Sequence, residues 1–262
     1  MAGIHSVLVT GAWRGIGLEF TKQFLTNPDF RAEIVIATCL VPAEAKDLLE
    51  LQEKHSALHI LELDVTKFDT FNELVNKVQA IVGHRGLTLL INNAGIGSPM
   101  HKLESIDADR YIAVLKTNTV GPVLLTKALL PLLRQSASVN AARYHDRPLS
   151  ITRAAVINIT SIFASILQTG SDKTMEKVRA YGYRESKTAL NMATQLMSRE
   201  LEEDGILVES IHPGFVITDM TAQLKATTTT ETSVTSMLKT MLDFSEKNKI
   251  GFRSYDGEII PF

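Results

Sequence analysis

Short runs of apolar, β-branched residues alternate along the chain with longer stretches in which apolar positions recur every three or four residues. The short runs predict β-strands, and the longer stretches predict helices. The predicted strands are Ser6–Thr10, Ile34–Thr38, Leu58–Leu63, Thr88–Asn92, Ala154–Thr160 and Ile206–Ile211. The predicted helices are Leu18–Leu25, Ala43–Lys54, Phe68–Val82, Ile106–Leu133 and Tyr183–Glu203.

Strands that are apolar throughout are typical of a parallel sheet with helices on both faces, and right-handed crossovers then give a doubly wound, Rossmann-type α/β fold. Without a shift in composition, we expect one domain over residues 1–262. Residues 136–150, 168–180 and 215–248 break the rhythm and are expected to be surface additions. The last two follow predicted strands and should border the active site, 215–248 as a substrate lid containing a flexible patch at Thr227–Thr230.

Composition narrows the class of protein. Apolar residues make up 45% of the chain, and the net charge of −2 gives no reason to expect nucleic acid or an anionic membrane as a partner. Cys39 is the only cysteine, which excludes an intramolecular disulfide and suits a reducing compartment. No apolar run reaches the roughly 18 residues of a membrane span, and Met1–Ser6 has no leader pattern, so we expect a cytoplasmic protein.

The first predicted strand leads directly into the glycine-rich loop Thr10-Gly11-Ala12-Trp13-Arg14-Gly15-Ile16-Gly17. Between a strand and a helix, glycines permit a tight turn and let the backbone approach a pyrophosphate, which the exposed N–H groups and the helix dipole then favour. A tight turn alone would also use glycine. The position of the loop, rather than the glycines, indicates a dinucleotide.

Tyr183 and Lys187 open the last predicted helix, and the four-residue spacing places them on one face. An adjacent ammonium favours the phenolate, which lowers the pKa of a tyrosine so that it can exchange protons with a substrate. In isolation the pair would be a core tyrosine and a solvated lysine. Tyr181 is a rival, but Glu185 lies four residues beyond it and would raise its pKa.

The Gly-x-x-x-Gly-x-Gly spacing resembles that of the short-chain dehydrogenase/reductase family, and motifs along nearly the whole chain fit it. These motifs are Asp64-Val65, Asn92-Asn93-Ala94-Gly95, Asn118-Thr119-Val120-Gly121, Asn158-Ile159-Thr160-Ser161, Tyr183 to Lys187, and Pro213 to Met220. Gly257–Phe262 resembles the last strand of the family. The arrangement is similar to that of sniffer-type carbonyl reductases.

The resemblance implies a site. The implied catalytic residues are Asn118, Ser161, Tyr183 and Lys187. The implied cofactor-binding residues are Gly11, Arg14, Gly15, Ile16, Gly17, Asp64, Val65, Asn92, Ala94, Gly95, Tyr183, Lys187, Pro213, Gly214, Val216 and Thr218. Several alternatives stay open: Asp64 can cap the next helix, Asn118 can be structural, and Ser165 can replace Ser161, which precedes Tyr183 by an unusually long segment.

Charge near the adenosine ribose favours NADP(H) over NAD(H). The second predicted strand ends at Cys39-Leu40 without the carboxylate that would bind a 2′-hydroxyl, and Arg14 matches a basic residue of NADP(H)-dependent relatives. Arg14 can also be an ordinary surface arginine. An apolar pocket wall is expected from Phe163, Ile166, Leu167, Phe215 and Met220.

The resemblance therefore predicts hydride transfer between nicotinamide and a small carbonyl or alcohol substrate, with carbonyl reduction favoured. A cofactor-binding redox sensor, or an epimerase or dehydratase, is the alternative. The histidines show no metal-ligand spacing, so no metal is expected. A homodimer or homotetramer is expected through 118–135 and 183–203.

Overall fold

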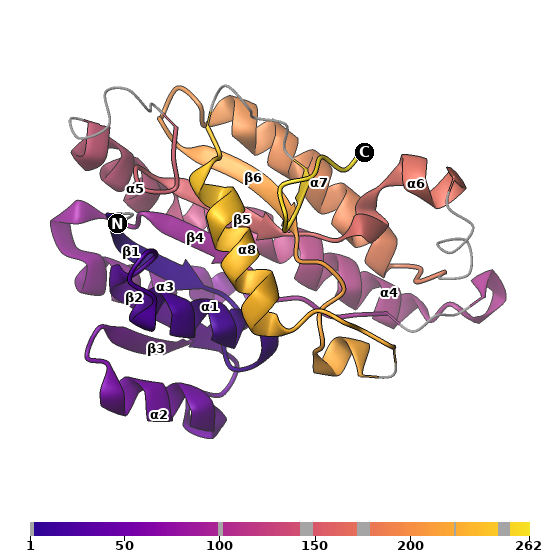
Figure 1. The fold of residues 1–262 in the computed structure, drawn as a ribbon, viewed down its shortest axis with the longest axis horizontal. Coiled ribbons are helices and arrows are strands. Elements are labelled where there is room, and N and C mark those ends of the chain that lie inside the picture. The colour runs from indigo at the N-terminus through magenta and orange to yellow at the C-terminus, as the bar shows by residue number, and fades with distance from the viewer. Residues whose placement is uncertain (1–2, 99–101, 142–148, 172–178, 223, 246–251) are drawn as a thin grey trace.

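The computed structural model describes residues 3–98, 102–141, 149–171, 179–222, 224–245 and 252–262. Its centre is a parallel sheet of seven strands in the order β3-β2-β1-β4-β5-β6-β7 (Figure 1). The strands are β1 (Ile4–Val9), β2 (Ala32–Cys39), β3 (Leu58–Glu62), β4 (Leu89–Asn92), β5 (Ala155–Ile159), β6 (Leu207–His212) and β7 (Arg253–Ser254). The order reverses between β1 and β4, the point at which doubly wound sheets bind ligands.

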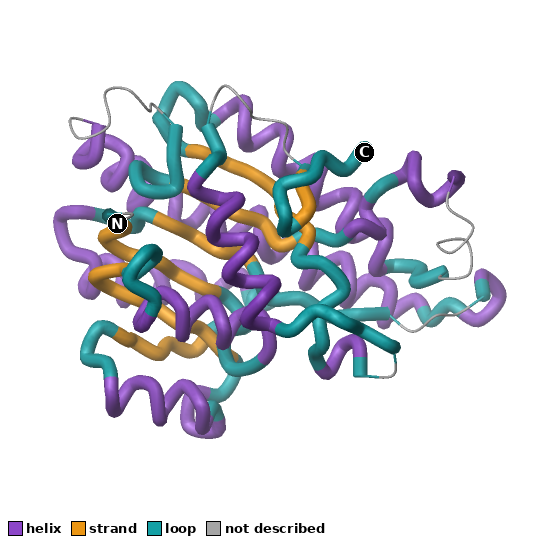
Figure 2. The backbone as a smooth tube through the Cα atoms, in the orientation of Figure 1, coloured by secondary structure: helices purple, strands orange, loops and turns teal. Residues whose placement is uncertain are grey.

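Helices connect the strands and cover both faces of the sheet (Figure 2). They are α1 (Gly15–Thr26), α2 (Lys46–Lys54), α3 (Phe71–Val82), α4 (Ala108–Leu115), α5 (Gly121–Ala141), α6 (Ile166–Ser171), α7 (Tyr183–Glu200) and α8 (Thr230–Leu242). The predicted Rossmann-type α/β class is therefore confirmed.

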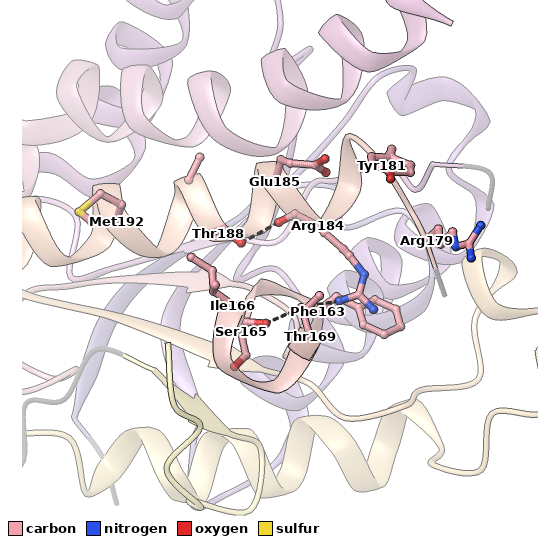
Figure 3. A pocket seen from close by; sticks show the side chains of 11 residues that line it. Phe163, Ser165, Ile166, Thr169, Arg179, Tyr181, Arg184, Glu185, Thr188 and Met192 are labelled. Carbon is pink, nitrogen blue, oxygen red and sulfur yellow. Dashed lines mark hydrogen bonds between the residues drawn. The ribbon is translucent and has the colours of Figure 1, made fainter. Parts of the chain in front are cut away.

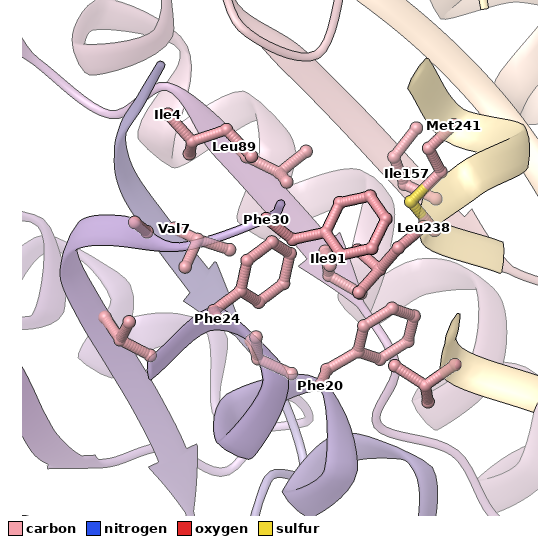
Figure 4. Close-up of a cluster of buried hydrophobic side chains, with 14 of the residues drawn as sticks. Ile4, Val7, Phe20, Phe24, Phe30, Leu89, Ile91, Ile157, Leu238 and Met241 are labelled. Atoms are coloured by element: carbon pink, nitrogen blue, oxygen red, sulfur yellow. The ribbon is translucent and has the colours of Figure 1, made fainter. Parts of the chain in front are cut away.

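Each face of the sheet has its own apolar core, as strands buried on both sides require. On one face, Phe20 and Phe24 of α1 and Leu238 and Met241 of α8 pack over the central strands (Figure 4). On the other face, α3 and α5 contribute a second cluster that includes Leu74, Val78, Leu125, Leu129 and Leu133. Helix α7 lies on this second face, beside β6.

Helix α8 corrects the expected extent of the lid. It occupies 230–242 within the predicted lid, but Val234 and Met237 are fully buried in the core against α1. The patch Thr227–Thr230 is part of this structure rather than a loose segment. Thr228 pairs with Val216, and the Thr229 side chain accepts a hydrogen bond from Thr232 N at the start of α8. Residues 215–229 remain as a candidate lid, and residues 223 and 246–248 of the predicted lid lie outside the described residues.

The predicted helix 106–133 is divided. Pro122 has no N–H for the carbonyl of Asn118, so the helix cannot continue regularly there. The Gly121 N–H instead reaches back to the Lys116 carbonyl, which gives a π-helical turn, Lys116–Val120, between α4 and α5. Such turns are frequent at functional sites.

Two boundaries were also wrong. The last strand is β7 (Arg253–Ser254), and of the predicted strand 257–262 only Ile259 pairs, in a single antiparallel bridge with Arg253. The predicted addition 136–150 begins inside α5, where Ser136 is fully buried. Residues 142–148, and 172–178 of the predicted addition 168–180, lie outside the described residues.

Candidate active site

The glycine loop is shaped by its backbone. Gly11 and Gly15 have φ values of +63° and +57°, which favour glycine. A Cβ atom on Gly17 would lie 2.4 Å from the Gly11 carbonyl oxygen. Helix α1 begins at Gly15, and neither a side-chain cap at Arg14 nor an acidic residue occupies its first turn. The N–H groups of Gly15, Ile16 and Gly17 therefore suit the pyrophosphate of a dinucleotide.

The adenosine side of the groove lies beside the end of β2. The Ala12 N–H donates to the Thr38 carbonyl (2.9 Å), which holds the glycine loop against that strand. Farther along, Asp64 accepts bonds from the Thr66 N–H (2.9 Å) and hydroxyl (2.7 Å), and these bonds hold the pKa of its carboxyl below the usual range although burial opposes them. Helix α3 begins after Thr70. Asp64 therefore forms a turn and does not cap α3, and Val65 beside it is buried.

The two asparagines after β4 have different environments. Asn92 donates to Asn158 Oδ1 (2.8 Å) and Thr126 Oγ1 (3.3 Å), inside a buried polar cluster beneath the sheet. Asn93 donates to the Thr10 carbonyl (2.8 Å) and contacts the glycine loop. The Asn92 side chain is therefore engaged within the sheet, and the assignment of Asn92 to the cofactor stays a prediction. Asn93 supports the loop, and the tandem Asn-Asn pattern did not reveal which amide does so.

Tyr183, Ser161 and Lys187 come together at the carboxyl end of β5. Burial raises the pKa of the Tyr183 hydroxyl, and the neighbouring Ser161 side chain lowers it by less. The Lys187 ammonium donates to the Ile159 carbonyl (2.8 Å) and lies 5.9 Å from the centre of the Tyr183 ring. Burial lowers the pKa of Lys187 to about 8.

The direction of the Tyr183 pKa separates the effect of burial from that of charge. Burial raises this pKa by more than Ser161 lowers it, so the lowering predicted from the sequence depends on neighbouring positive charge. Lys187 is itself destabilised as a cation by burial, which limits its influence. Formation of a phenolate at this position therefore requires more positive charge than Lys187 supplies.

Asn118 joins the π-helical turn to the segment that follows β4. Its Oδ1 accepts from the Ile96 N–H (2.9 Å), and its Nδ2 donates to the Ile96 carbonyl (2.9 Å) and to Ser186 Oγ (3.0 Å). A Cβ atom on Gly95 would lie 3.2 Å from Asn118 Oδ1 and 3.7 Å from Lys187 Nζ. Asn118 and Lys187 therefore converge on Gly95, beside Ala94 and the glycine loop.

The segment after β6 covers the groove. Gly214 has φ +85° and lies against the Tyr255 ring, where a Cβ would approach Cε1 to 2.9 Å. From this turn, Val216 and Thr218 extend toward the glycine loop. The Thr218 methyl lies 3.5 Å from the Cβ position of Gly15, and the Met220 side chain lies 3.3 Å from that of Gly97. Asp219 forms an ion pair with Arg14.

A cavity of about 680 Å³ lies on the outer side of α7 (Figure 3). Its lining includes Tyr181 and Ser165 but neither Tyr183 nor Ser161. Ser165 Oγ accepts from the Gln168 N–H (3.1 Å) at the start of α6. Both alternatives to the catalytic residues therefore line this cavity together with Phe163. The centre of the Phe163 ring lies 6.5 Å from that of Tyr183, in an edge-on arrangement.

The expected apolar wall is divided between these two regions. Met220 lies at the candidate active site and Ile166 lines the outer cavity, whereas Phe163 lines the cavity and also contacts Tyr183. Leu167 is exposed, and its N–H donates to the Phe262 carbonyl (3.1 Å).

A metal-binding cluster and a membrane-spanning helix are both absent from the described residues. No group of three or more His, Cys, Asp or Glu side chains is placed to hold a metal ion. None of the described helices combines the length and apolar character that crossing a membrane demands.

Comparison with known proteins gives consistent matches. A family model described as short chain dehydrogenase matches residues 5–141 and 148–229. The structure of carbonyl reductase Sniffer of D. melanogaster is 36% identical with a TM-score of 0.91, covering 99% of this chain and 100% of that one. An NADPH-bound carbonyl reductase from chicken fatty liver is 37% identical with a TM-score of 0.91, covering 99% and 95%. An uncharacterized oxidoreductase of Schizosaccharomyces pombe is 29% identical over 270 residues, covering 97% and 96%.

Proposed function

Because the chain belongs to the short chain dehydrogenase family, we propose that it is an NADP(H)-dependent carbonyl reductase whose whole length forms one catalytic domain. The observation that carries this proposal is the convergence of Ser161, Tyr183, Lys187 and Asn118 beside the glycine loop. The Ser161 side chain is near enough to the Tyr183 hydroxyl to lower its pKa, so a proton donor and a second hydroxyl are neighbours.

Each residue has a proposed role in carbonyl reduction. Tyr183 donates its proton to the carbonyl oxygen, and its raised pKa keeps that proton available at neutral pH. Ser161 hydrogen bonds to the same oxygen. Lys187 binds the ribose, and Asn118 fixes the strand end at Gly95 against which Lys187 lies. The bound nicotinamide supplies the hydride and, when oxidised, positive charge that favours the phenolate.

The cofactor preference is a proposal of its own. The glycine cradle and the uncapped start of α1 suit the pyrophosphate that NADP(H) and NAD(H) share. Arg14 supplies positive charge for a 2′-phosphate, and β2 ends at Cys39, followed by the exposed Leu40, without a carboxylate to bind a 2′-hydroxyl. One relative supports this preference, because the chicken carbonyl reductase is NADPH-bound.

The test follows the absorbance of NADPH against a panel of aldehydes, ketones and quinones. We expect turnover of at least one carbonyl class, with the products identified as alcohols or hydroquinones. Calorimetric titration with NADPH and NADH checks the preference, and tighter binding of NADH would contradict it. Binding of NADPH without turnover of any panel member would favour the redox sensor.

We also propose a homodimer, or a homotetramer built from it, through α5 and α7 in a reducing cytoplasm. Exposed apolar side chains on α4, α7 and the π-helical turn support the interface: Ile112, Val120, Met192 and Leu196. The buried, unpaired thiol of Cys39 suits the compartment. Light scattering should give a dimer mass that Leu196→Glu reduces, and an unchanged monomer mass for both proteins would contradict this proposal.

A further inference from the structure

Two segments about 200 residues apart meet at Arg14. The Arg14 guanidinium forms an ion pair with the Asp219 carboxylate and stacks 4.3 Å from the centre of the Trp13 ring. Thr218, next to Asp219, lies against Gly15 at the start of α1. Asp219 therefore holds the segment after β6 against the loop that suits the pyrophosphate.

Arg14 belongs to a loop that contacts the adenosine side of the groove through Ala12. The Ala12 N–H is bonded to the carbonyl of Thr38 in β2, and the adenosine ribose of a dinucleotide lies beyond the carboxyl end of that strand in doubly wound folds. One guanidinium thus has two possible anionic partners on opposite sides of the groove: the Asp219 carboxylate and a ribose 2′-phosphate.

We propose that Asp219 is a specificity-determining residue that competes with the 2′-phosphate of NADP(H) for Arg14. Binding of NADP(H) exchanges the carboxylate for the phosphate, whereas NAD(H) has no 2′-phosphate and leaves the ion pair in place. This inference rests on the role given to Arg14 under the proposed function. It adds that the chain binds NADP(H) less tightly than Arg14 alone would allow.

The exposure of the pair sets the size of the effect. The side chains of Arg14 and Asp219 are 53% and 69% exposed, so the pair is easily exchanged. A phosphate monoester brings more negative charge to the guanidinium than a carboxylate does. Exposed pairs of this kind change an equilibrium by about two- to fivefold. The carboxylate therefore moderates the preference for NADP(H) and does not abolish it.

The test measures the dissociation constants of NADPH and NADH by calorimetry for the wild type and for Asp219→Asn. We expect Asp219→Asn to tighten NADPH binding about two- to fivefold and to leave NADH binding nearly unchanged, which raises the ratio of the two constants. Asp204→Asn is the matched control, because it also removes a carboxylate from an exposed arginine pair, with Arg134 (2.8 Å). That control should leave the ratio unchanged.

A second background isolates Arg14. In Arg14→Gln, adding Asp219→Asn should no longer change the ratio, because the shared arginine is gone. Equal weakening of both cofactors by Asp219→Asn would overturn the proposal, since the pair would then be a clasp over the bound dinucleotide. An unchanged ratio would overturn it as well.

The two proposals fail separately. The wild-type ratio tests the preference for NADP(H), and the change in that ratio on Asp219→Asn tests the competition. A wild type that prefers NADH, with an Asp219→Asn variant shifted toward NADPH, would reject the preference and retain the competition. No NADPH binding by either protein would reject both.

Discussion

The groove of the candidate active site has a floor and a roof that are built differently. The floor, residues 10–17 and 92–96, is held by backbone contacts, such as the approach of Gly17 to the Gly11 carbonyl. The roof, residues 215–229, touches the floor through side chains, and Phe215, Ile217 and Met220 in it are about half exposed. Backbone contacts allow little variation, whereas side chains can rearrange. The floor is thus suited to an invariant cofactor, and the roof to whatever substrate the chain reduces.

Two glycine substitutions give the largest contrast. Gly17→Ala should lower the free energy of unfolding by more than about 3 kcal/mol and abolish cofactor binding, because its Cβ would lie 2.4 Å from a backbone oxygen. Gly97→Ala meets only the flexible Met220 side chain, at 3.3 Å, and should cost less than about 1 kcal/mol. Urea denaturation and NADPH titration of both variants measure this contrast. Similar losses in the two variants would remove the distinction between floor and roof.

Acid should destabilise the fold at His212, the last residue of β6 before the roof begins. Burial lowers the pKa of His212 to about 4, against an attraction to Asp256 that raises it. Protons then bind the unfolded chain more readily between about pH 6.5 and pH 4, so stability present above pH 6.5 is lost as the pH falls toward 4, by up to about 3 kcal/mol.

Denaturation at pH 4 to 8 should therefore show a shallower acid loss for His212→Asn than for the wild type. His84→Asn, at an exposed histidine, is the matched control and should follow the wild type. Parallel curves for the wild type and His212→Asn would show that His212 does not contribute.

Asn118 tests the floor at its junction with the π-helical turn. Asn118→Ala leaves both backbone groups of Ile96 and the Ser186 hydroxyl without their partner, at a cost of about 2 kcal/mol in unfolding free energy. If Asn118 only holds the segment after β4 in place, kcat should fall in proportion to the fraction of protein that is folded. We expect a larger fall, because Lys187 shares the contact at Gly95.

The smallest effect is expected in the roof. Met220→Ala should raise KM for bulky carbonyls a few-fold, because the side chain covers Gly97, and should change the melting temperature very little because Met220 is about half exposed. Steady-state kinetics and thermal denaturation measure the two quantities. A large fall in melting temperature would place Met220 in the fixed part of the structure.

The same division explains what the sequence could predict. Apolar periodicity located the strands and helices and predicted the fold class, because burial on two faces leaves a continuous pattern. Motifs placed Ser161, Tyr183 and Lys187 at strand or helix ends, where the structure brings them together. The ion pair of Arg14 with Asp219 joins segments about 200 residues apart, and no local pattern reports such a contact.

Other misses have local causes. The sequence pattern placed α8 in the lid because its threonine-rich start did not indicate a helix. Thr229 is nevertheless the N-cap of that helix. The π-helical turn was not predicted, although Pro122, four residues after Asn118, indicates that a regular helix is interrupted there. The raised pKa of Tyr183 depends on burial, which the spacing of Tyr183 and Lys187 does not reveal.

A matched pair of tyrosine variants tests whether Tyr183 is the proton donor. NADPH oxidation with a reducible carbonyl should be compared for Tyr183→Phe and Tyr181→Phe, with the NADPH dissociation constant measured for each. We predict that kcat/KM falls about 10²- to 10⁴-fold in Tyr183→Phe alone, with NADPH binding retained in both. Wild-type turnover by Tyr183→Phe would show that Tyr183 is not the proton donor.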